Sequence, residues 1–380
     1  MARLGDICTI VSGSTPKSNI PEYWDGDIKW ITPAELNEET YIINDSVRHI
    51  TELGVAKTGL KPFPQGTVIL SSRAPIGKTA IAGCEMYCNQ GFKNLICSDK
   101  INPRYLYWFL TCNTEYLNSL GRGATFKEIS KEIVANIEIP VPTLEQQIRI
   151  AEKFEKIREL IALRKEQLAK LDQLVKSRFI ELFGDQETNH YNLNVGKLSD
   201  VADIYLGLTH TPTYTEQGRP FLSVRDISSG VIDFSNCHYV TEEEFCSLPN
   251  GARPKVGDML FCRVGTIGKP VIISENTPEF GTFVSVGYLR KKANVNNYYL
   301  KSWMENDYFM RQVYNNVAGA SQINLNTGWL KNFRILIPSM ELQEQFAAFV
   351  EQTDKSKVAI QQSLDKLELL KKSLMQEYFG

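Results

Sequence analysis

The sequence predicts a mixed α/β protein in which two repeated domains alternate with two long coiled-coil helices. One observation is an internal repeat, because residues 142–184 match residues 338–380 without a gap. Each copy of the repeat also carries apolar residues at the alternating spacing of four and three that is typical of a coiled coil. The regions before each copy contain short β-branched and aromatic runs, separated by Gly, Pro, Asn and Asp, which indicate strands and turns.

These observations give a predicted order of domain, helix, domain, helix. The regions that precede the helical segments also correspond, with small insertions: residues 4–7 match 198–201, and residues 76–78 match 267–269. The predicted boundaries are a first domain over residues 1–142, a first long helix over 143–184, a second domain over 185–338 and a second long helix over 339–380.

Inside the two domains, particular runs predict strands and helices. Residues 67–70 in the first domain and 270–273 in the second are predicted strands, because both are rich in β-branched residues. Helices are expected to begin near Tyr105 and Tyr298. Each domain is therefore predicted to be a mixed α/β or mostly β unit.

The long helices have recognisable ends. Thr143 and Gln146 form a possible capping box after Pro142, and Ser339 is a possible cap with an acidic residue, Glu341, in the first turn. Gly184 is a plausible stop for the first helix.

Ten seam positions can be assigned in each helix, of which eight are apolar in the first and seven in the second. The remaining positions are polar, for example Arg164 and Lys357. The apolar residues predicted to pack against a partner helix are Ile150, Phe154, Ile157, Ile161, Leu168, Leu171, Val175, Leu182, Phe346, Val350, Ile360, Leu364, Leu367 and Leu374. Tyr378 is the seventh apolar seam position of the second helix.

A helix of about 39 residues spans roughly 58 Å at about 1.5 Å per residue, which is more than the width of a small domain. We therefore expect the two helices to pair with each other outside the domain cores. The alternative is that they are two ordinary core helices. Four further apolar residues widen the first stripe and suggest that helices of another subunit pack there: Leu160, Leu163, Leu174 and Phe179.

The overall composition excludes few functions. The chain has 380 residues with 43% hydrophobic content, which is enough for two or three domains. Its 42 Lys and Arg residues against 44 Asp and Glu residues give a net charge of -2. This balance gives no global sign of a polyanion-binding protein, although a local basic face can exist within it.

Cysteines and histidines give no metal or disulfide pattern. The eight cysteines contain no CxxC pair and the four histidines have no ligand spacing, so buried, reduced structural thiols and structural histidines are expected. We find neither a signal-peptide pattern nor an apolar run of about 18 residues, and a soluble, cytoplasmic protein is therefore expected.

Motifs for catalysis and cofactor binding are incomplete. Residues 76–79 resemble the end of a phosphate loop, but Ser72 stands where the first glycine is needed. Asn102-Pro103 is followed by Arg104 rather than by the Pro of an adenine methyltransferase motif. The acidic residues Glu22, Asp25 and Asp27 are interpreted as solvated surface. We predict no catalytic, cofactor-binding or metal site in this chain.

Basic and small polar residues recur in Gly-rich turns of both domains, where backbone amides and side chains can approach phosphates and base edges. The alternative is that the glycines merely close turns and the charges face water. The candidate DNA-binding residues are Thr15, Lys17, Arg73, Lys78, Asn89, Gln90, Arg122, Thr125, Lys127, Thr209, Thr211, Arg225, Arg263, Thr266, Lys269, Ser321, Gln322 and Asn324.

Several strings in combination resemble one family along the whole chain. They are residues 13–16, 21–31, 72–77 (Ser-Arg-Ala-Pro-Ile-Gly), 89–92 (Asn-Gln-Gly-Phe), 139–147, 263–268 (Arg-Val-Gly-Thr-Ile-Gly) and 337–343. The chain is thereby similar to the specificity subunits of type I restriction-modification enzymes.

This resemblance implies a non-catalytic subunit with two target-recognition domains, each reading one half of a bipartite site in double-stranded DNA. The same resemblance implies two long antiparallel coiled-coil helices that set the spacer and dock the modification subunits. It also implies two modification subunits that use S-adenosylmethionine and restriction subunits that use ATP and Mg, with no cofactor on this chain. The target bases are not specified. A bare scaffold and a self-contained methyltransferase-nuclease are the alternatives; a DNA mobility shift and a methylation assay distinguish them.

Overall fold

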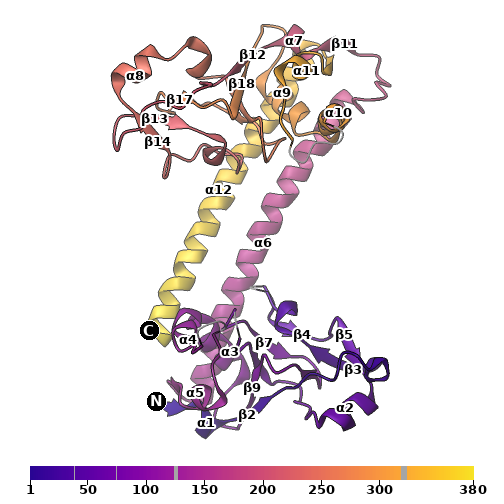
Figure 1. Ribbon diagram of the computed structural model, residues 1–380, viewed down its shortest axis with the longest axis vertical. Coiled ribbons are helices and arrows are strands. Elements are labelled where there is room, and N and C mark those ends of the chain that lie inside the picture. Colours follow the sequence, from indigo (N-terminus) through magenta and orange to yellow (C-terminus); the bar gives the residue numbers. More distant parts are fainter. Residues whose placement is uncertain (38, 74, 124–126, 318–322) are drawn as a thin grey trace. The chain divides into compact units, whose positions relative to one another are not determined.

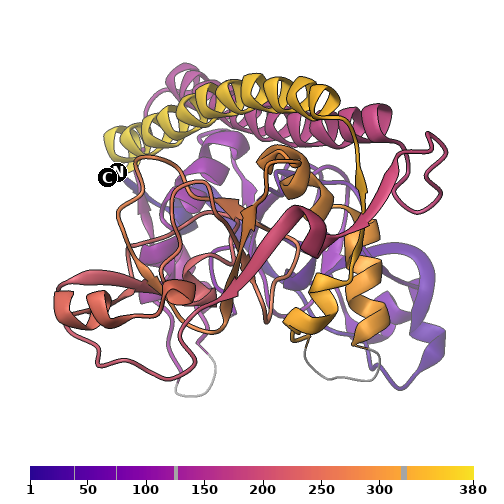
Figure 2. The same cartoon turned by 90° about the horizontal axis from the view of Figure 1, so that it is seen from above.

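The computed structural model describes all residues except 38, 74, 124–126 and 318–322. The chain divides into two compact units, and each is described by itself. Unit 1 comprises Met1–Lys165 and Gln362–Gly380, and unit 2 comprises Glu166–Gln361. Two long helices, α6 (Leu144–Phe183) and α12 (Met340–Phe379), each contribute one part to each unit; both are unbroken ribbons in Figures 1 and 2.

Unit 1 contains a five-stranded sheet of order β2-β9-β6-β7-β4, a three-stranded sheet of order β5-β3-β8 and the short ladder β1-β10. Its strands are β1 (Ala2–Arg3), β2 (Cys8–Ser12), β3 (Trp24–Ile31), β4 (Ile42–Ile43), β5 (Arg48–Ile50), β6 (Val68–Leu70), β7 (Thr79–Ala82), β8 (Tyr87–Cys88), β9 (Lys93–Cys97) and β10 (Glu138–Ile139). Its shorter helices are α1 (Leu4–Ile7), α2 (Glu52–Thr58), α3 (Pro103–Cys112), α4 (Thr114–Ser119) and α5 (Lys131–Ala135).

Unit 2 contains a four-stranded sheet of order β12-β18-β15-β16, a three-stranded sheet of order β14-β13-β17 and the ladder β11-β19. Its strands are β11 (Asn194–Lys197), β12 (Ala202–Leu206), β13 (Arg219–Leu222), β14 (His238–Val240), β15 (Met259–Cys262), β16 (Val271–Ile272), β17 (Gly281–Thr282), β18 (Val286–Lys291) and β19 (Arg334–Ile337). Its shorter helices are α7 (Leu198–Val201), α8 (Glu242–Ser247), α9 (Asn297–Met304), α10 (Asp307–Asn316) and α11 (Thr327–Lys331).

The two units repeat one topology, which confirms the predicted pseudo-repeat and the mixed α/β class. In the three-stranded sheets, β3 pairs antiparallel with β5 and parallel with β8, and β13 pairs antiparallel with β14 and parallel with β17. The larger sheets follow the same order, except that β4 of unit 1 has no counterpart among the described residues of unit 2. The predicted strands at 67–70 and 270–273 become β6 and β16, and the helices expected near Tyr105 and Tyr298 become α3 and α9.

Local signals also set the ends of the long helices. The Thr143 backbone N–H donates to Gln146 Oε1 (3.1 Å) and the Gln146 N–H donates to Thr143 Oγ1 (3.3 Å), which forms the predicted capping box. Ser339 Oγ accepts from the Leu342 N–H at 3.4 Å. Gly184 ends α6 with φ at 68°, a left-handed conformation that glycine adopts at little cost.

The seam positions of the two long helices are covered by protein. All twenty seam positions of α6 and α12 are buried or half-buried. In unit 1, Arg164 Nε donates to Ser363 Oγ at 3.2 Å, while Phe154 packs near the end of α12. In unit 2, Lys357 Nζ lies 2.7 Å from Asp172 Oδ1. Within each unit, residues further along α6 contact residues nearer the start of α12, so the two helices are antiparallel there.

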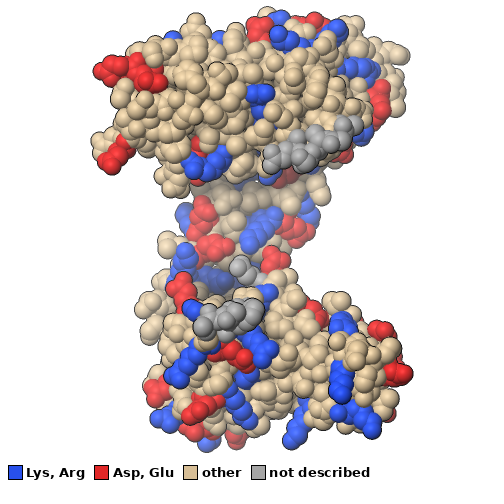
Figure 3. All heavy atoms as spheres, in the orientation of Figure 1, with Lys and Arg blue, Asp and Glu red and all other residues tan. Residues whose placement is uncertain are grey.

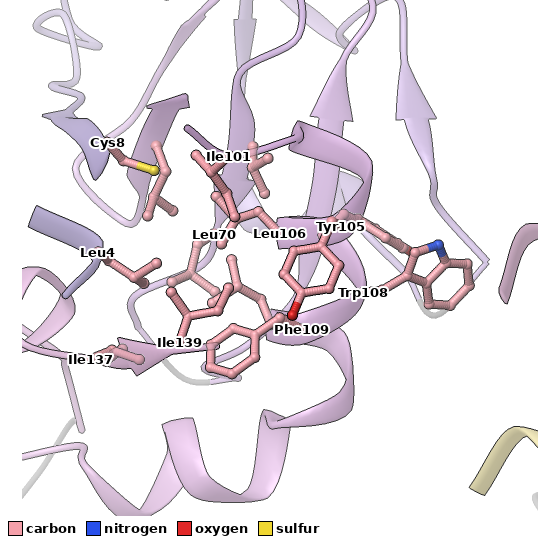
Figure 4. Close-up of a cluster of buried hydrophobic side chains, with 14 of the residues drawn as sticks. Leu4, Cys8, Leu70, Ile101, Tyr105, Leu106, Trp108, Phe109, Ile137 and Ile139 are labelled. Carbon is pink, nitrogen blue, oxygen red and sulfur yellow. The ribbon is translucent and has the colours of Figure 1, made fainter. Parts of the chain in front are cut away.

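The expectation that the helices pair outside the domain cores is wrong at their ends. The core of unit 1, in which Figure 4 shows Leu106, Phe109 and Ile139 pointing toward one another, also includes Phe154 and Phe379. Phe154 stacks on Trp108 with ring centroids 5.1 Å apart. Each domain therefore uses a helix end as one wall of its own core, and the two interpretations that sequence analysis treated as alternatives both hold.

Phe179 shows the same effect in unit 2. It is 2% exposed and stacks on Tyr299 with ring centroids 5.5 Å apart. The prediction that Phe179 packs against another subunit is therefore wrong. Of the other residues that widen the stripe, Leu160 is half-buried, whereas Leu163 and Leu174 are 52% and 48% exposed. The predicted surface for further helices is thus reduced to the exposed leucines.

The eight cysteines are free, but the prediction that all are buried is only partly correct. Cys8, Cys88, Cys237 and Cys262 are buried, and Cys246 is exposed. No helix among the described residues is long and apolar enough to cross a membrane.

One buried glutamine in each unit ties the start of a long helix to its domain. Gln147, on α6, is fully buried; its amide donates to the carbonyls of Lys100 (3.1 Å) and Pro142 (2.9 Å) and accepts from the Asn102 N–H at 2.8 Å.

Gln343, on α12, makes the corresponding contacts in unit 2. It donates to the carbonyls of Asn294 (3.3 Å) and Pro338 (2.9 Å), and it accepts from the Asn296 N–H at 2.8 Å. Asn102 and Asn296 in turn cap α3 and α9. Each glutamine therefore connects the start of its long helix to the proline just before that helix and to the segment that leads into α3 or α9.

We predict that Gln343→Ala lowers the free energy of unfolding by about 1 to 3 kcal/mol, because three buried or partly buried backbone groups lose their partner. Gln345→Ala, two residues along the helix at an exposed position, is the matched control and should change stability by less than about 0.5 kcal/mol. Urea denaturation measures the free energy of unfolding of both variants, and amide hydrogen exchange shows whether the change lies in unit 2. Equal effects of the two substitutions would contradict a structural role for Gln343.

Candidate nucleic-acid interface

The first candidate region is the Gly-rich turn after β6 in unit 1, where Arg73 meets Glu128. The Arg73 Nε–H donates to Glu128 Oε2 at 2.9 Å, and the two residues also form an isolated β-bridge. The Arg73 side chain is 45% exposed. Arg73 is therefore oriented by a carboxylate while almost half of its side-chain surface stays exposed.

A second cation lies beneath this pair. Lys93, on β9, is buried, and its ammonium lies 3.3 Å from Glu128 Oε1 and donates to Ser72 Oγ at 3.2 Å. Burial raises the pKa of Glu128, but the hydrogen bonds from Arg73 and Lys93 outweigh it and hold the pKa below its ordinary value. Glu128 is thus ionised at neutral pH and keeps Arg73 in place. Sequence analysis did not identify Lys93 or Glu128, because only the fold brings them to Arg73.

Glu128 also closes the loop that carries the other candidates of this region. Arg122 and Glu128 exchange two backbone hydrogen bonds, of 3.0 and 2.9 Å, and both Arg122 and Lys127 are exposed. Thr125 lies outside the described residues. Arg73, Arg122 and Lys127 are therefore brought together around the base of one loop.

The remaining candidates of unit 1 lie nearby on two other segments. Thr15 Oγ1 donates to Gln90 Oε1, and both side chains are exposed. Asn89 is half-buried and its Oδ1 accepts from the Gly91 N–H at 2.9 Å, so it mainly shapes its own turn. Lys17 is exposed, whereas Lys78 is half-buried and donates to the Pro33 carbonyl at 3.2 Å.

In unit 2, Arg263 is held by the protein. Its Nε–H donates to the Leu325 carbonyl (3.1 Å), Nη1 donates to the Val284 carbonyl (3.0 Å), and Nη2 donates to Asn324 Oδ1 (3.3 Å). Burial lowers the pKa of this guanidinium. The geometry favours a structural role for Arg263, with Asn324 as its partner.

Arg73 and Arg263 differ because they are not at equivalent positions. The Ser72 carbonyl accepts from the Ile129 N–H at 2.9 Å, and the Arg263 carbonyl accepts from the Leu325 N–H at 2.8 Å, so Ser72 and Arg263 correspond. Successive side chains of an extended segment face opposite sides. A shift of one residue therefore places Arg73 outward and Arg263 inward.

The other candidates of unit 2 are exposed. Thr266 and Lys269 lie in the turn before β16, and Arg225 donates through Nη2 to the Asn236 carbonyl at 3.1 Å. Thr209 and Thr211 are exposed on the segment after β12. Ser321 and Gln322 lie outside the described residues.

The three-stranded sheets carry exposed groups that sequence analysis missed. Arg48 lies over the Trp24 ring, 3.6 Å from its centroid. Tyr214, which is 39% exposed, stacks on His238 with centroids 4.2 Å apart. The alternation of polar and apolar residues along these strands was a usable signal for Arg48, whereas the stack depends on segments that only the fold brings together.

Other predictions concerned the acidic surface residues and the lack of a metal site. Glu22, Asp25 and Asp27 are exposed, in agreement with a solvated surface. Within the described parts of the chain, no group of three or more His, Cys, Asp and Glu residues could hold a metal ion. Lys and Arg are interspersed with Asp and Glu over both units in the view of Figure 3, which agrees with the near-zero net charge.

Comparison with known proteins gives a consistent picture. A family model described as "Type I restriction modification DNA specificity domain" matches residues 1–173 and 192–370. A type I restriction enzyme specificity subunit (MjaIX) of Methanocaldococcus jannaschii is 30% identical over 379 residues, which cover 92% of this chain and 85% of that protein.

Solved structures share the fold. A chain from a structure of the type I R-M system, concerned with its assembly and conformational transition, aligns with a TM-score of 0.62 at 20% identity over 100% of this chain and 96% of that one. The type I restriction-modification S subunit from M. genitalium aligns with a TM-score of 0.56 at 16% identity, over 100% and 95% of the two chains.

We predict that Arg263→Met lowers the free energy of unfolding by about 1 to 3 kcal/mol, because two backbone carbonyls and Asn324 lose their donor. Lys269→Met, at a nearby exposed position, is the matched control and should have an effect within about 0.5 kcal/mol. Thermal and urea unfolding measure the difference. A stable Arg263→Met protein would show that this arginine is free for another role.

Proposed function

The chain belongs to the family of type I restriction-modification DNA specificity proteins, and from this membership we propose that it is a DNA-recognition subunit with no catalytic site of its own. Each unit recognises one half of a bipartite sequence in double-stranded DNA. The observation that carries this proposal is the duplication of one topology with different polar residues at corresponding turns. Two similar frames with unlike polar surfaces are suited to read two unlike half-sites.

Within this function, the geometry ranks the candidate contacts. Arg73, Arg122 and Lys127 are the strongest in unit 1, because they are exposed and gather at one loop. Thr15, Lys17 and Gln90 add an exposed polar edge. In unit 2, the exposed candidates are Thr209, Thr211, Arg225, Thr266 and Lys269. Arg263 and Asn324 support the turn that carries Thr266 and Lys269.

The long helices are proposed to set the spacer and to bind two modification subunits. Support comes from their continuity from one unit into the other and from the apolar residues that pairing leaves exposed, Leu163, Leu174 and Leu369. In this assembly the modification subunits supply S-adenosylmethionine chemistry and restriction subunits supply ATP- and Mg-dependent cleavage. We infer a cytoplasmic location, where such an assembly meets DNA.

The modular proposal predicts the outcome of a domain exchange. Replacing residues 191–332 with the corresponding region of a relative of different specificity should alter one half of the recognised sequence and leave the other half unchanged, because each unit has its own core. Mapping of methylated adenines in a host that expresses the chimera with the modification subunits measures this. A change in both halves would contradict independent reading, and a complex that binds no DNA would favour a scaffold.

A second prediction concerns the loop cluster of unit 1. Arg73→Ala should weaken DNA binding by the assembled enzyme by about 1 to 3 kcal/mol and relax specificity if the guanidinium contacts a base. If Arg73 contacts phosphate, binding should weaken on all sequences and the salt dependence should decrease. Arg149→Ala removes an exposed arginine from α6 and is the matched control. Equal affinities for Arg73→Ala and the unsubstituted chain would remove Arg73 from the interface.

A further inference from the structure

The two units differ at one edge of the larger sheet. In unit 1, the edge of β7 is covered by β4 of the same chain, which runs parallel to it. The Ile81 N–H donates to the Tyr41 carbonyl and the Gly83 N–H donates to the Ile43 carbonyl, both at 2.8 Å. Ile81 is accordingly 6% exposed. Residues 41–43 thus act as a strand that completes this sheet.

Tyr41 anchors that strand. Its ring packs edge-on against Tyr107 with centroids 4.7 Å apart, and Arg158 of α6 lies 4.6 Å from its centroid. Its hydroxyl donates to Glu155, which is also paired with Arg104. The aromatic side chain therefore enters the angle between α3 and α6, while the two isoleucines that follow it pair with β7.

In unit 2, the strand that corresponds to β7 is β16. The Ile273 N–H donates to the Asp258 carbonyl at 2.9 Å, as the Ala82 N–H donates to the Thr67 carbonyl at 2.9 Å in unit 1, so Ile272 corresponds to Ile81. Its outer edge has no strand partner among the described residues, and Ile272 is half-buried instead of buried. An edge without a strand partner offers N–H and C=O groups to an incoming strand. The loop of unit 2 that passes close by, with Gly230 beside Lys269, forms no ladder with β16 among the described residues.

Unit 2 has a pocket of about 490 Å³, and several of its lining residues are counterparts of the residues that surround Tyr41. Tyr105 and Tyr299 donate to corresponding carbonyls, those of Pro140 and Leu336. Tyr107 and Lys301 each lie two residues after one of these tyrosines, so Lys301 of the pocket is the counterpart of Tyr107. By the same repeat, the pocket residues Tyr298, Ser302 and Asp354 are counterparts of Arg104, Trp108 and Arg158, all of which surround Tyr41.

The lining of this pocket suits a tyrosine. Val175, Phe179 and Val350 supply an apolar wall, and Lys301 and Asp354 supply a donor and an acceptor for a hydroxyl group. The charges are balanced: Lys357 lies 2.7 Å from Asp172 and 3.5 Å from Asp354. A balanced lining disfavours a nucleic-acid backbone, which needs an excess of positive charge.

We propose that this edge and pocket of unit 2 bind an extended segment of a partner protein that resembles residues 41–43 of this chain: a tyrosine followed by two β-branched residues. The tyrosine enters the pocket, and the following backbone adds a parallel strand to β16. The segment thereby supplies from outside the strand that unit 1 supplies itself. This interaction does not depend on DNA recognition by the chain.

A synthetic peptide tests the proposal on the full chain. The probe is Glu-Thr-Tyr-Ile-Ile-Asn-Asp, the sequence of residues 39–45 with blocked ends, titrated by calorimetry and followed by amide hydrogen exchange. We expect saturable binding and slower exchange at residues 268–274. Residues 77–83 of unit 1 are the internal control and should not change, because their edge is already occupied.

Two altered peptides separate the parts of the interaction. Replacing the tyrosine with alanine should weaken binding by about tenfold or more, because the pocket stays empty. N-methylation of the second isoleucine should abolish protection, because it removes an N–H that parallel pairing needs. Ile272→Pro should have the same effect from the protein side, and its melting temperature checks folding.

The proposal is overturned if the probe shows no saturable binding at about 1 mM, if protection appears elsewhere, or if the alanine peptide binds as well as the tyrosine peptide. Because these measurements contain no DNA, a negative result leaves the recognition function standing, and loss of DNA binding leaves this interaction standing.

Discussion

The hydrogen bonds of one buried glutamine determine how each domain is joined to its helix pair. Gln147 and Gln343 each bind a carbonyl just before their own helix and two backbone groups before a domain helix, α3 or α9. A side-chain amide can satisfy these groups at once because it carries both donors and an acceptor. The long helix therefore leaves its domain in a fixed direction, and the aromatic cores can use the helix as a wall.

The two units share this frame but support the equivalent Gly-rich turns with different polar residues. Unit 1 has Lys93 and Ser72 beneath the turn after β6, with Glu128 as the counter-charge. Unit 2 has Arg263 at the position of Ser72 and the uncharged Asn324 as its partner. A cation supports the loop in both units: the buried Lys93 of β9 in unit 1, and in unit 2 the half-buried Arg263, which follows β15. The exposed residues of the turns are thus free to differ while the turns themselves are retained.

The repeat, the seam and the helix caps could be predicted because they depend on local spacing. The fate of Phe179 could not, since whether an apolar residue meets Tyr299 or another subunit depends on packing across the chain. The same limit applies to the candidate interface: composition identified Arg73 and Arg263 as similar arginines in glycine-rich turns. A single-residue difference in register, invisible without the hydrogen bonds of the strand, places one in solvent and the other among carbonyls.

Polar residues in the seam have a specific consequence for the helix pair. Arg164 and Lys357 occupy seam positions, where apolar residues would give a more stable coiled coil. Arg164 donates to Ser363, and Lys357 pairs with Asp172 on the opposite helix. A slip of either helix by a turn would leave these charged groups against leucines without partners, at a desolvation cost that the apolar positions do not impose. The weaker part of the seam therefore fixes the antiparallel register that the stronger part stabilises.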